Sequence, residues 1–176
     1  MKELFKNRNY LLLFLGNSVS EMGNVVFGFV AGLYVQDLAI QSGGSLLGIR
    51  SGIILGIFMA LGAIIRVALT PIAGVLVDRW DKVKIIYLTD YLRGVMFVIV
   101  AFVFFKGVNN DTAMLILLAV TVVSGIVSAF FGPAISAATP EIVGLEKVQV
   151  AQGANGIINS TTMIVGIILG AAAFGL

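Results

Sequence analysis

The chain has 176 residues, of which 59% are hydrophobic and 11% charged, and its mean hydropathy is +1.07. A soluble domain carries about 25% charged residues, so this composition excludes a water-soluble globular domain and indicates an integral membrane protein. The absence of cysteine and histidine excludes disulfides, Cys/His metal sites and a histidine proton relay. The net charge of +2 comes with basic residues at the ends of apolar runs, which indicates no nucleic-acid partner.

Five hydrophobic segments are long enough to cross a bilayer, since a spanning helix needs about 20 mostly apolar residues. They cover residues 10–36, 48–76, 84–105, 113–138 and 149–173. Backbone groups in lipid must be hydrogen-bonded within their own segment, so helices are expected. The sequence therefore predicts an all-α membrane protein, with residues 1–176 forming a single transmembrane helical bundle. The last segment ends without a polar flank, and we expect a truncated bundle.

The first two spans carry polar residues near the middle of the bilayer, where a polar side chain is costly and commonly has a function. Asn17, Glu21 and Asn24 follow one another at steps of four and three residues, which places them on one helical face. Glu21 and Arg66 each lie about 16–18 Å from the expected membrane entry of their span. We expect Glu21 and Arg66 to approach one another or to share a cavity. Together with Asn17 and Asn24, they are the candidates for binding protons or substrate in that cavity. The alternative is a fixed ion pair that holds the two helices together.

The densest cluster of charge lies in the stretch GVLVDRWDKVKII, between the second and third spans. Gly74 and Asp78 are four residues apart, so they share a face at the end of the second helix. A glycine there allows another helix to approach closely. Asp78 would then meet a cation or a helix N-terminus, while the neighbouring basic residues would face an anionic lipid leaflet. The alternative is a topology anchor with no conformational role.

The basic residues of the loops predict which side of the membrane the chain starts from. With a cytoplasmic N-terminus, the cytoplasmic segments hold seven basic residues: Lys2, Lys6, Arg8, Arg79, Lys82, Lys84 and Lys147. The outer loops hold two, Arg50 and Lys106. The positive-inside rule therefore predicts a cytoplasmic N-terminus and a cytoplasmic turn between spans two and three.

The turn resembles the loop motif of the major facilitator superfamily, G-x-L-a-D-R-x-G-R-[RK]-[RK]. The matching positions are Gly74, Leu76, Asp78, Arg79 and Lys82. Asp81 stands where the family most often has glycine, and Val83 stands at a usually basic position. The later stretches TDYLRG and FFGPAISAATPEIV look like the branch that contains macrolide-efflux and enterobactin-exporter-type proteins.

The resemblance implies the first five helices of a twelve-helix fold, that is, part of its N-terminal six-helix half. It also implies a conformational latch, meaning a contact between the two halves that forms and breaks as access alternates. Its residues here would be Gly74, Asp78, Arg79, Lys82, Asp90 and Arg93. Their opposing groups would lie in the C-terminal half, which this chain lacks. For Asp90 and Arg93, three residues apart, a local ion pair is the alternative.

The function expected from this resemblance is secondary transport, by proton-coupled efflux of small amphipathic compounds or drugs across the plasma or inner membrane. The chain alone is not expected to transport. A second hypothesis is a non-transporting bundle that self-associates through G-x-x-x-G faces at Gly28/Gly32, Gly52/Gly56 and Gly166/Gly170. An enzyme is not expected, because the chain lacks a Ser/His pair, a metal constellation and a phosphate loop. No cofactor is expected either.

Overall fold

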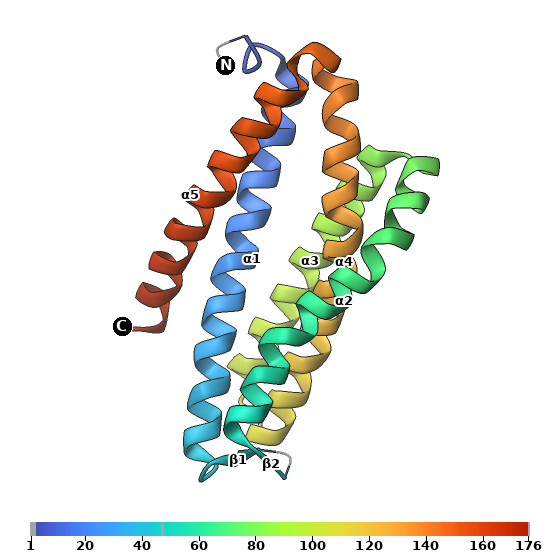
Figure 1. The fold of residues 1–176 in the computed structure, drawn as a ribbon. Coiled ribbons are helices and arrows are strands. Elements are labelled where there is room, and N and C mark those ends of the chain that lie inside the picture. Colours follow the sequence, from blue (N-terminus) through green and yellow to red (C-terminus); the bar gives the residue numbers. More distant parts are fainter. Residues whose placement is uncertain (1–2, 47, 176) are drawn as a thin grey trace. The chain divides into compact units, whose positions relative to one another are not determined.

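The computed structural model describes residues 3–46 and 48–175 and is almost entirely helical (Figure 1). The long helices are α1 (Arg8–Gln41), α2 (Ser51–Arg79), α3 (Lys82–Phe105), α4 (Asn110–Val143) and α5 (Val148–Phe174). Among the described residues, these five are long and apolar enough to span a membrane. The prediction of an all-α membrane protein with five spans is therefore confirmed.

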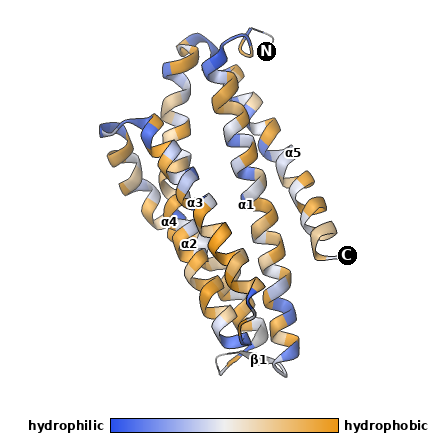
Figure 2. Cartoon of the chain, turned by 180° about the vertical axis from the view of Figure 1, so that it is seen from behind, coloured by the Kyte–Doolittle hydropathy of each residue, from blue (hydrophilic) through white to orange (hydrophobic). Residues whose placement is uncertain are grey.

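Hydrophobic residues predominate in the middle of the helices, and hydrophilic residues gather at connections such as the α2–α3 turn (Figure 2). Only 11% to 39% of each span is buried against the rest of the chain. The remaining apolar surface is far larger than a soluble protein exposes, so it must be covered by lipid or by further protein. This is the pattern expected of helices whose solvent is a bilayer.

The ends of the helices differ from the predicted spans by a few residues, and for α1 a polar cap and a glycine turn explain the differences. α1 begins two residues early because Asn7 Oδ1 accepts the backbone N–H groups of Asn9 (3.0 Å) and Tyr10 (3.4 Å). α1 continues to Gln41, past the predicted end at residue 36, and stops where Gly43 and Gly44 adopt positive φ angles of 67° and 89°.

The sequence did not predict three features of the connections. Residues 48–50 precede α2 in a small antiparallel hairpin of β1 (Ser45–Leu46) and β2 (Ile49–Arg50). α4 runs through Pro140, where a break was expected, and ends before Gly144, whose φ of 77° closes the helix. A short 3₁₀ helix, η1 (Leu145–Lys147), then leads into α5.

The chain divides into two compact parts, which are described separately. The first comprises residues 1–30 and 136–176. Here α5 packs against α1 through two glycines: a Cβ on Gly166 would lie 2.7 Å from Val25 Cγ1, and one on Gly170 would lie 2.9 Å from Phe29 Cδ1. Tyr10 is fully buried and donates its hydroxyl to the Ala151 carbonyl at 3.3 Å. The Gly166/Gly170 pair is therefore a real close contact, but it lies within one chain.

The second part comprises residues 31–135, which hold the end of α1, the hairpin, α2, α3 and most of α4. Its closest helix contact joins α2 and α4, where a Cβ on Gly125 would lie 2.9 Å from the Gly62 carbonyl oxygen. The two other predicted glycine faces are open. A Cβ on Gly28, Gly52 or Gly56 would meet nothing within 4 Å, and one on Gly32 would make only ordinary contact.

Candidate functional site

The α2–α3 turn is the first element of the candidate site, and only Trp80 and Asp81 lie between the two helices. The Trp80 N–H closes α2 by donating to the carbonyls of Leu76 (3.1 Å) and Val77 (3.3 Å). Asp81 Oδ1 then accepts the N–H groups of Val83 (3.0 Å) and Lys84 (3.1 Å). Asp81 is thus the N-cap of α3, which explains the aspartate at this position and the tightness of the turn.

The predicted latch residues of the turn lie at the surface of residues 31–135 or are half-buried there. Asp78 and Arg79 are exposed, whereas Lys82 and Gly74 are half-buried. Within the described residues of that part, Asp78 makes no hydrogen bond or ion pair. A Cβ on Gly74 would meet nothing within 4 Å, so the face that Gly74 shares with Asp78 is open to an approaching helix. The latch role itself stays a prediction.

Asp90 and Arg93 form a pair on α3 with a nitrogen–oxygen distance of 3.4 Å. The Arg93 side chain is only 4% exposed, whereas that of Asp90 is 31% exposed. Arg93 also lies 3.4 Å from Ser128 Oγ and stacks its guanidinium 4.9 Å from the centre of the Phe131 ring, both on α4. The local pair weighed as an alternative therefore exists, and Arg93 also contacts α4 through Ser128 and Phe131. Membership in the latch stays a prediction.

The polar residues of the first two spans fall in different parts of the chain. Asn17 is buried, and Glu21 and Asn24 are half-buried in the first part. Arg66, in the second part, is exposed near the middle of α2 and must be covered by protein or water in a membrane. Glu21 and Arg66 therefore belong to different parts of the chain, and their approach to one another stays a prediction.

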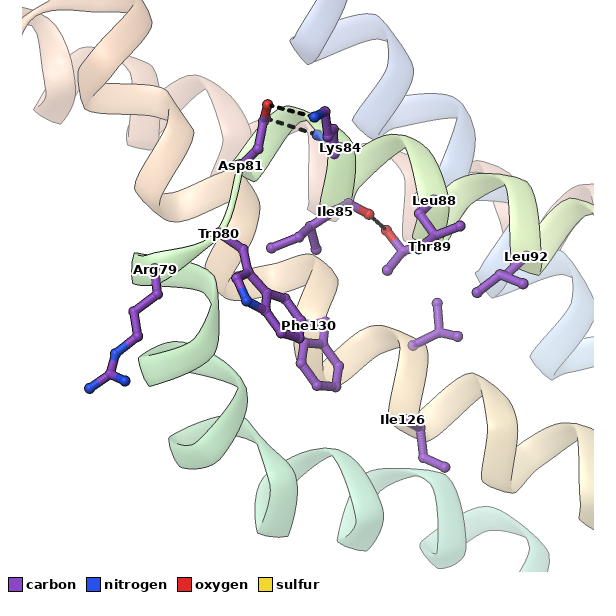
Figure 3. Close-up of a pocket in the computed structure, with 11 residues that line it drawn as sticks. Arg79, Trp80, Asp81, Lys84, Ile85, Leu88, Thr89, Leu92, Ile126 and Phe130 are labelled. Carbon is purple, nitrogen blue, oxygen red and sulfur yellow. Dashed lines mark hydrogen bonds and ion pairs between the residues drawn. The ribbon is translucent and has the colours of Figure 1, made fainter.

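An open cavity of about 640 Å³ lies beneath the turn, and no sequence pattern predicted it. Its polar lining residues are Arg79, Asp81 and Lys84, and its walls are apolar side chains of α3 and α4 (Figure 3). The Arg79 side chain extends away from these walls (Figure 3). Leu88 and Leu92 from α3 face Ile126 and Phe130 from α4. Sequence reasoning missed this cavity because its two walls are more than 30 residues apart in the chain.

Comparison with curated proteins finds relatives along the whole chain. A protein named "Uncharacterized MFS-type transporter YkuC", from Bacillus subtilis (strain 168), is 28% identical over 170 residues, which are 96% of this chain and 36% of that protein. Proteins named "Putative bacilysin exporter BacE", from Bacillus amyloliquefaciens and Bacillus subtilis, are 34% identical over 179 residues, 100% of this chain and 38% of each protein. No protein-family model matches, and no solved structure matches.

The chain therefore spans 36% to 38% of the length of these relatives. The finer assignment to a macrolide-efflux or enterobactin-exporter branch stays a prediction. Five candidate membrane spans, the loop motif between the second and third, and similarity to a protein named as an MFS-type transporter agree with one another. Together they support a relationship of this chain to the major facilitator superfamily.

Proposed function

We propose that the chain is part of a secondary transporter that exports small amphipathic compounds by alternating access, driven by a proton gradient. The observation that carries the proposal is the turn motif at the α2–α3 connection, in a chain similar along its length to proteins named as transporters. The name of the BacE proteins describes an exporter, which supports export as the direction of transport.

The proposed mechanism assigns different tasks to the two groups of polar residues. Asp78, exposed beside the open face of Gly74, would bind a cation or helix end from the second half of the transporter. Asn17, Glu21, Asn24 and Arg66 would line the central cavity, with Glu21 as the group that carries the proton. The Asp90–Arg93 pair would hold α3 on α4 while the halves move.

The expected result of an export assay is that cells expressing the complete coding sequence around these 176 residues accumulate less of a fluorescent amphipathic compound. Asp78→Asn should cut the efflux rate by at least about tenfold, because a hydrogen bond to a charged group contributes about 1.5–3 kcal/mol. The matched control is Glu146→Gln, which also neutralises an exposed acid but in η1.

The same assay tests the coupling of efflux to the proton gradient separately from the latch. A protonophore should abolish efflux, and Glu21→Gln should remove the response to the proton gradient. Efflux by Asp78→Asn at the wild-type rate would exclude the latch. Gradient-driven flux from liposomes that contain only the 176-residue chain would show that the second half is not needed.

Orientation is the second property to test, since we propose a cytoplasmic N-terminus in the plasma or inner membrane. The chain has no cysteine, so a single introduced cysteine reports its own side of the membrane. With a membrane-impermeant maleimide, Lys84→Cys should be labelled only after cells are opened, whereas Lys106→Cys, at the other end of α3, should be labelled in intact cells. Labelling of Lys84→Cys from outside would reverse the topology and exclude the cytoplasmic latch.

A further inference from the structure

The cavity beneath the α2–α3 turn is amphipathic along its length. Its rim carries two cations, Arg79 and Lys84, and one carboxylate, Asp81. Below the rim, Ile85, Leu88, Leu92, Ile126, Val127 and Phe130 make the walls apolar, with Thr89 as a further lining residue. The Thr89 hydroxyl donates its hydrogen to the Ile85 carbonyl at 2.7 Å, so it offers no free hydrogen-bond donor to a ligand between these walls. A polar head at the rim and an apolar chain below would match these surfaces.

The charge at the rim favours an anion. Asp81 Oδ1 is engaged by the two N–H groups at the start of α3, and its other oxygen lies 4.0 Å from Lys84 Nζ. Lys84 is 85% exposed and has ammonium donors to spare. Arg79 makes no hydrogen bond or ion pair within the described residues of 31–135, and its guanidinium fork suits a phosphate.

The length of the cavity matches one leaflet of a bilayer. Lys84 and Leu92 are eight residues apart on α3, which is about 12 Å at 1.5 Å per residue. Half of a typical hydrocarbon core is about 15 Å. Trp80, which is 55% exposed, lines the same cavity at the rim, the level at which tryptophan concentrates in membrane proteins.

We propose that this cavity binds an anionic phospholipid, with its phosphate at Arg79 and Lys84 and an acyl chain between α3 and α4. The volume of about 640 Å³ lies within the range of specific ligand pockets, about 300–1,000 Å³. The inference does not depend on which compound the transporter exports, because its basis is the membrane location and the chemistry of the cavity.

The single tryptophan of the chain makes the test direct, since Trp80 is the only one and lines the cavity. The 176-residue chain is reconstituted into bilayers of phosphatidylglycerol and phosphatidylcholine, and one lipid at a time carries bromine on its acyl chains. Bromine quenches tryptophan fluorescence on contact. At equal mole fractions, brominated phosphatidylglycerol should be preferred roughly fivefold over brominated phosphatidylcholine, the attraction expected of one basic residue.

Two pairs of variants separate a site from general attraction to the membrane surface. Arg79→Gln with Lys84→Gln should bring the preference close to one, whereas Arg50→Gln with Lys106→Gln, which removes two cations elsewhere, should retain it. Leu92→Phe with Ile126→Phe should fill the cavity and lower the preference. Their match is Leu115→Phe with Ile99→Phe, the same changes at exposed positions of α4 and α3 that do not line the cavity.

Three outcomes would overturn the proposal. Equal quenching by the two lipids would show no selectivity for an anion. A preference that survives filling of the cavity but disappears with the rim cations would show annular surface attraction and no site. If neither brominated lipid quenches Trp80, protein such as a second copy of the chain covers the cavity.

Discussion

Asp90→Asn is expected to lower the free energy of unfolding by roughly 3 kcal/mol, because it leaves a buried arginine without its carboxylate. Arg93 is 4% exposed and 3.4 Å from Asp90, so the variant removes the neighbouring carboxylate from a buried cation whose other contacts are with Ser128 and Phe131 of α4. Unfolding can be followed in detergent micelles by circular dichroism as the denaturant sodium dodecyl sulfate is added.

The matched control for this variant is Asp78→Asn, which makes the same chemical change at an exposed position with no partner in residues 31–135. It should change the free energy of unfolding by less than about 0.5 kcal/mol. Replacing both members of the pair, by Asp90→Leu and Arg93→Met, should recover most of the loss, because neither charge is then buried. Wild-type stability of Asp90→Asn would show that the pair does not fasten α3 to α4.

Gly125→Ala is the second variant with a large expected effect, a loss of about 1–2 kcal/mol even though alanine favours a helix by about 1 kcal/mol. The added methyl group would lie 2.9 Å from the Gly62 carbonyl oxygen and 3.1 Å from Ile65. A backbone carbonyl cannot rotate away as a side chain can, so α2 and α4 must separate.

Gly56→Ala is the matched control for the α2–α4 contact. Gly56 lies in α2, six residues before Gly62, and an added Cβ there would meet nothing within 4 Å. This variant should be neutral or up to about 1 kcal/mol more stable, from helix propensity alone. The same unfolding measurement compares both variants, and equal stabilities would mean that the close contact of Gly125 contributes nothing.

Local sequence was sufficient for features that depend on neighbouring residues. The five spans follow from the length of apolar runs, and the Asp90–Arg93 pair follows from a spacing of three residues. The helix ends were less predictable, because they depend on which polar side chain caps the backbone. Asn7 extends α1 at its start, and Gly144 rather than Pro140 ends α4.

Contacts between distant segments were beyond the sequence. G-x-x-x-G spacing predicted three glycine faces, yet only Gly166/Gly170 is tightly packed, and the Gly62–Gly125 contact has no such spacing. Small residues permit close approach but do not specify a partner. For the same reason the sequence could suggest that Glu21 and Arg66 meet, but only the placement of their helices could decide it.

The two-residue connection between α2 and α3 has a consequence for biosynthesis. So short a link holds the end of α2 and the start of α3 on the same side of the bilayer, at Trp80 and Asp81. Its flanks add Asp78, Arg79, Lys82 and Lys84, and each charge would cost roughly 2.5–3.5 kcal/mol to carry through the membrane centre. Once the two helices have left the translocon, their orientation is fixed for the lifetime of the protein.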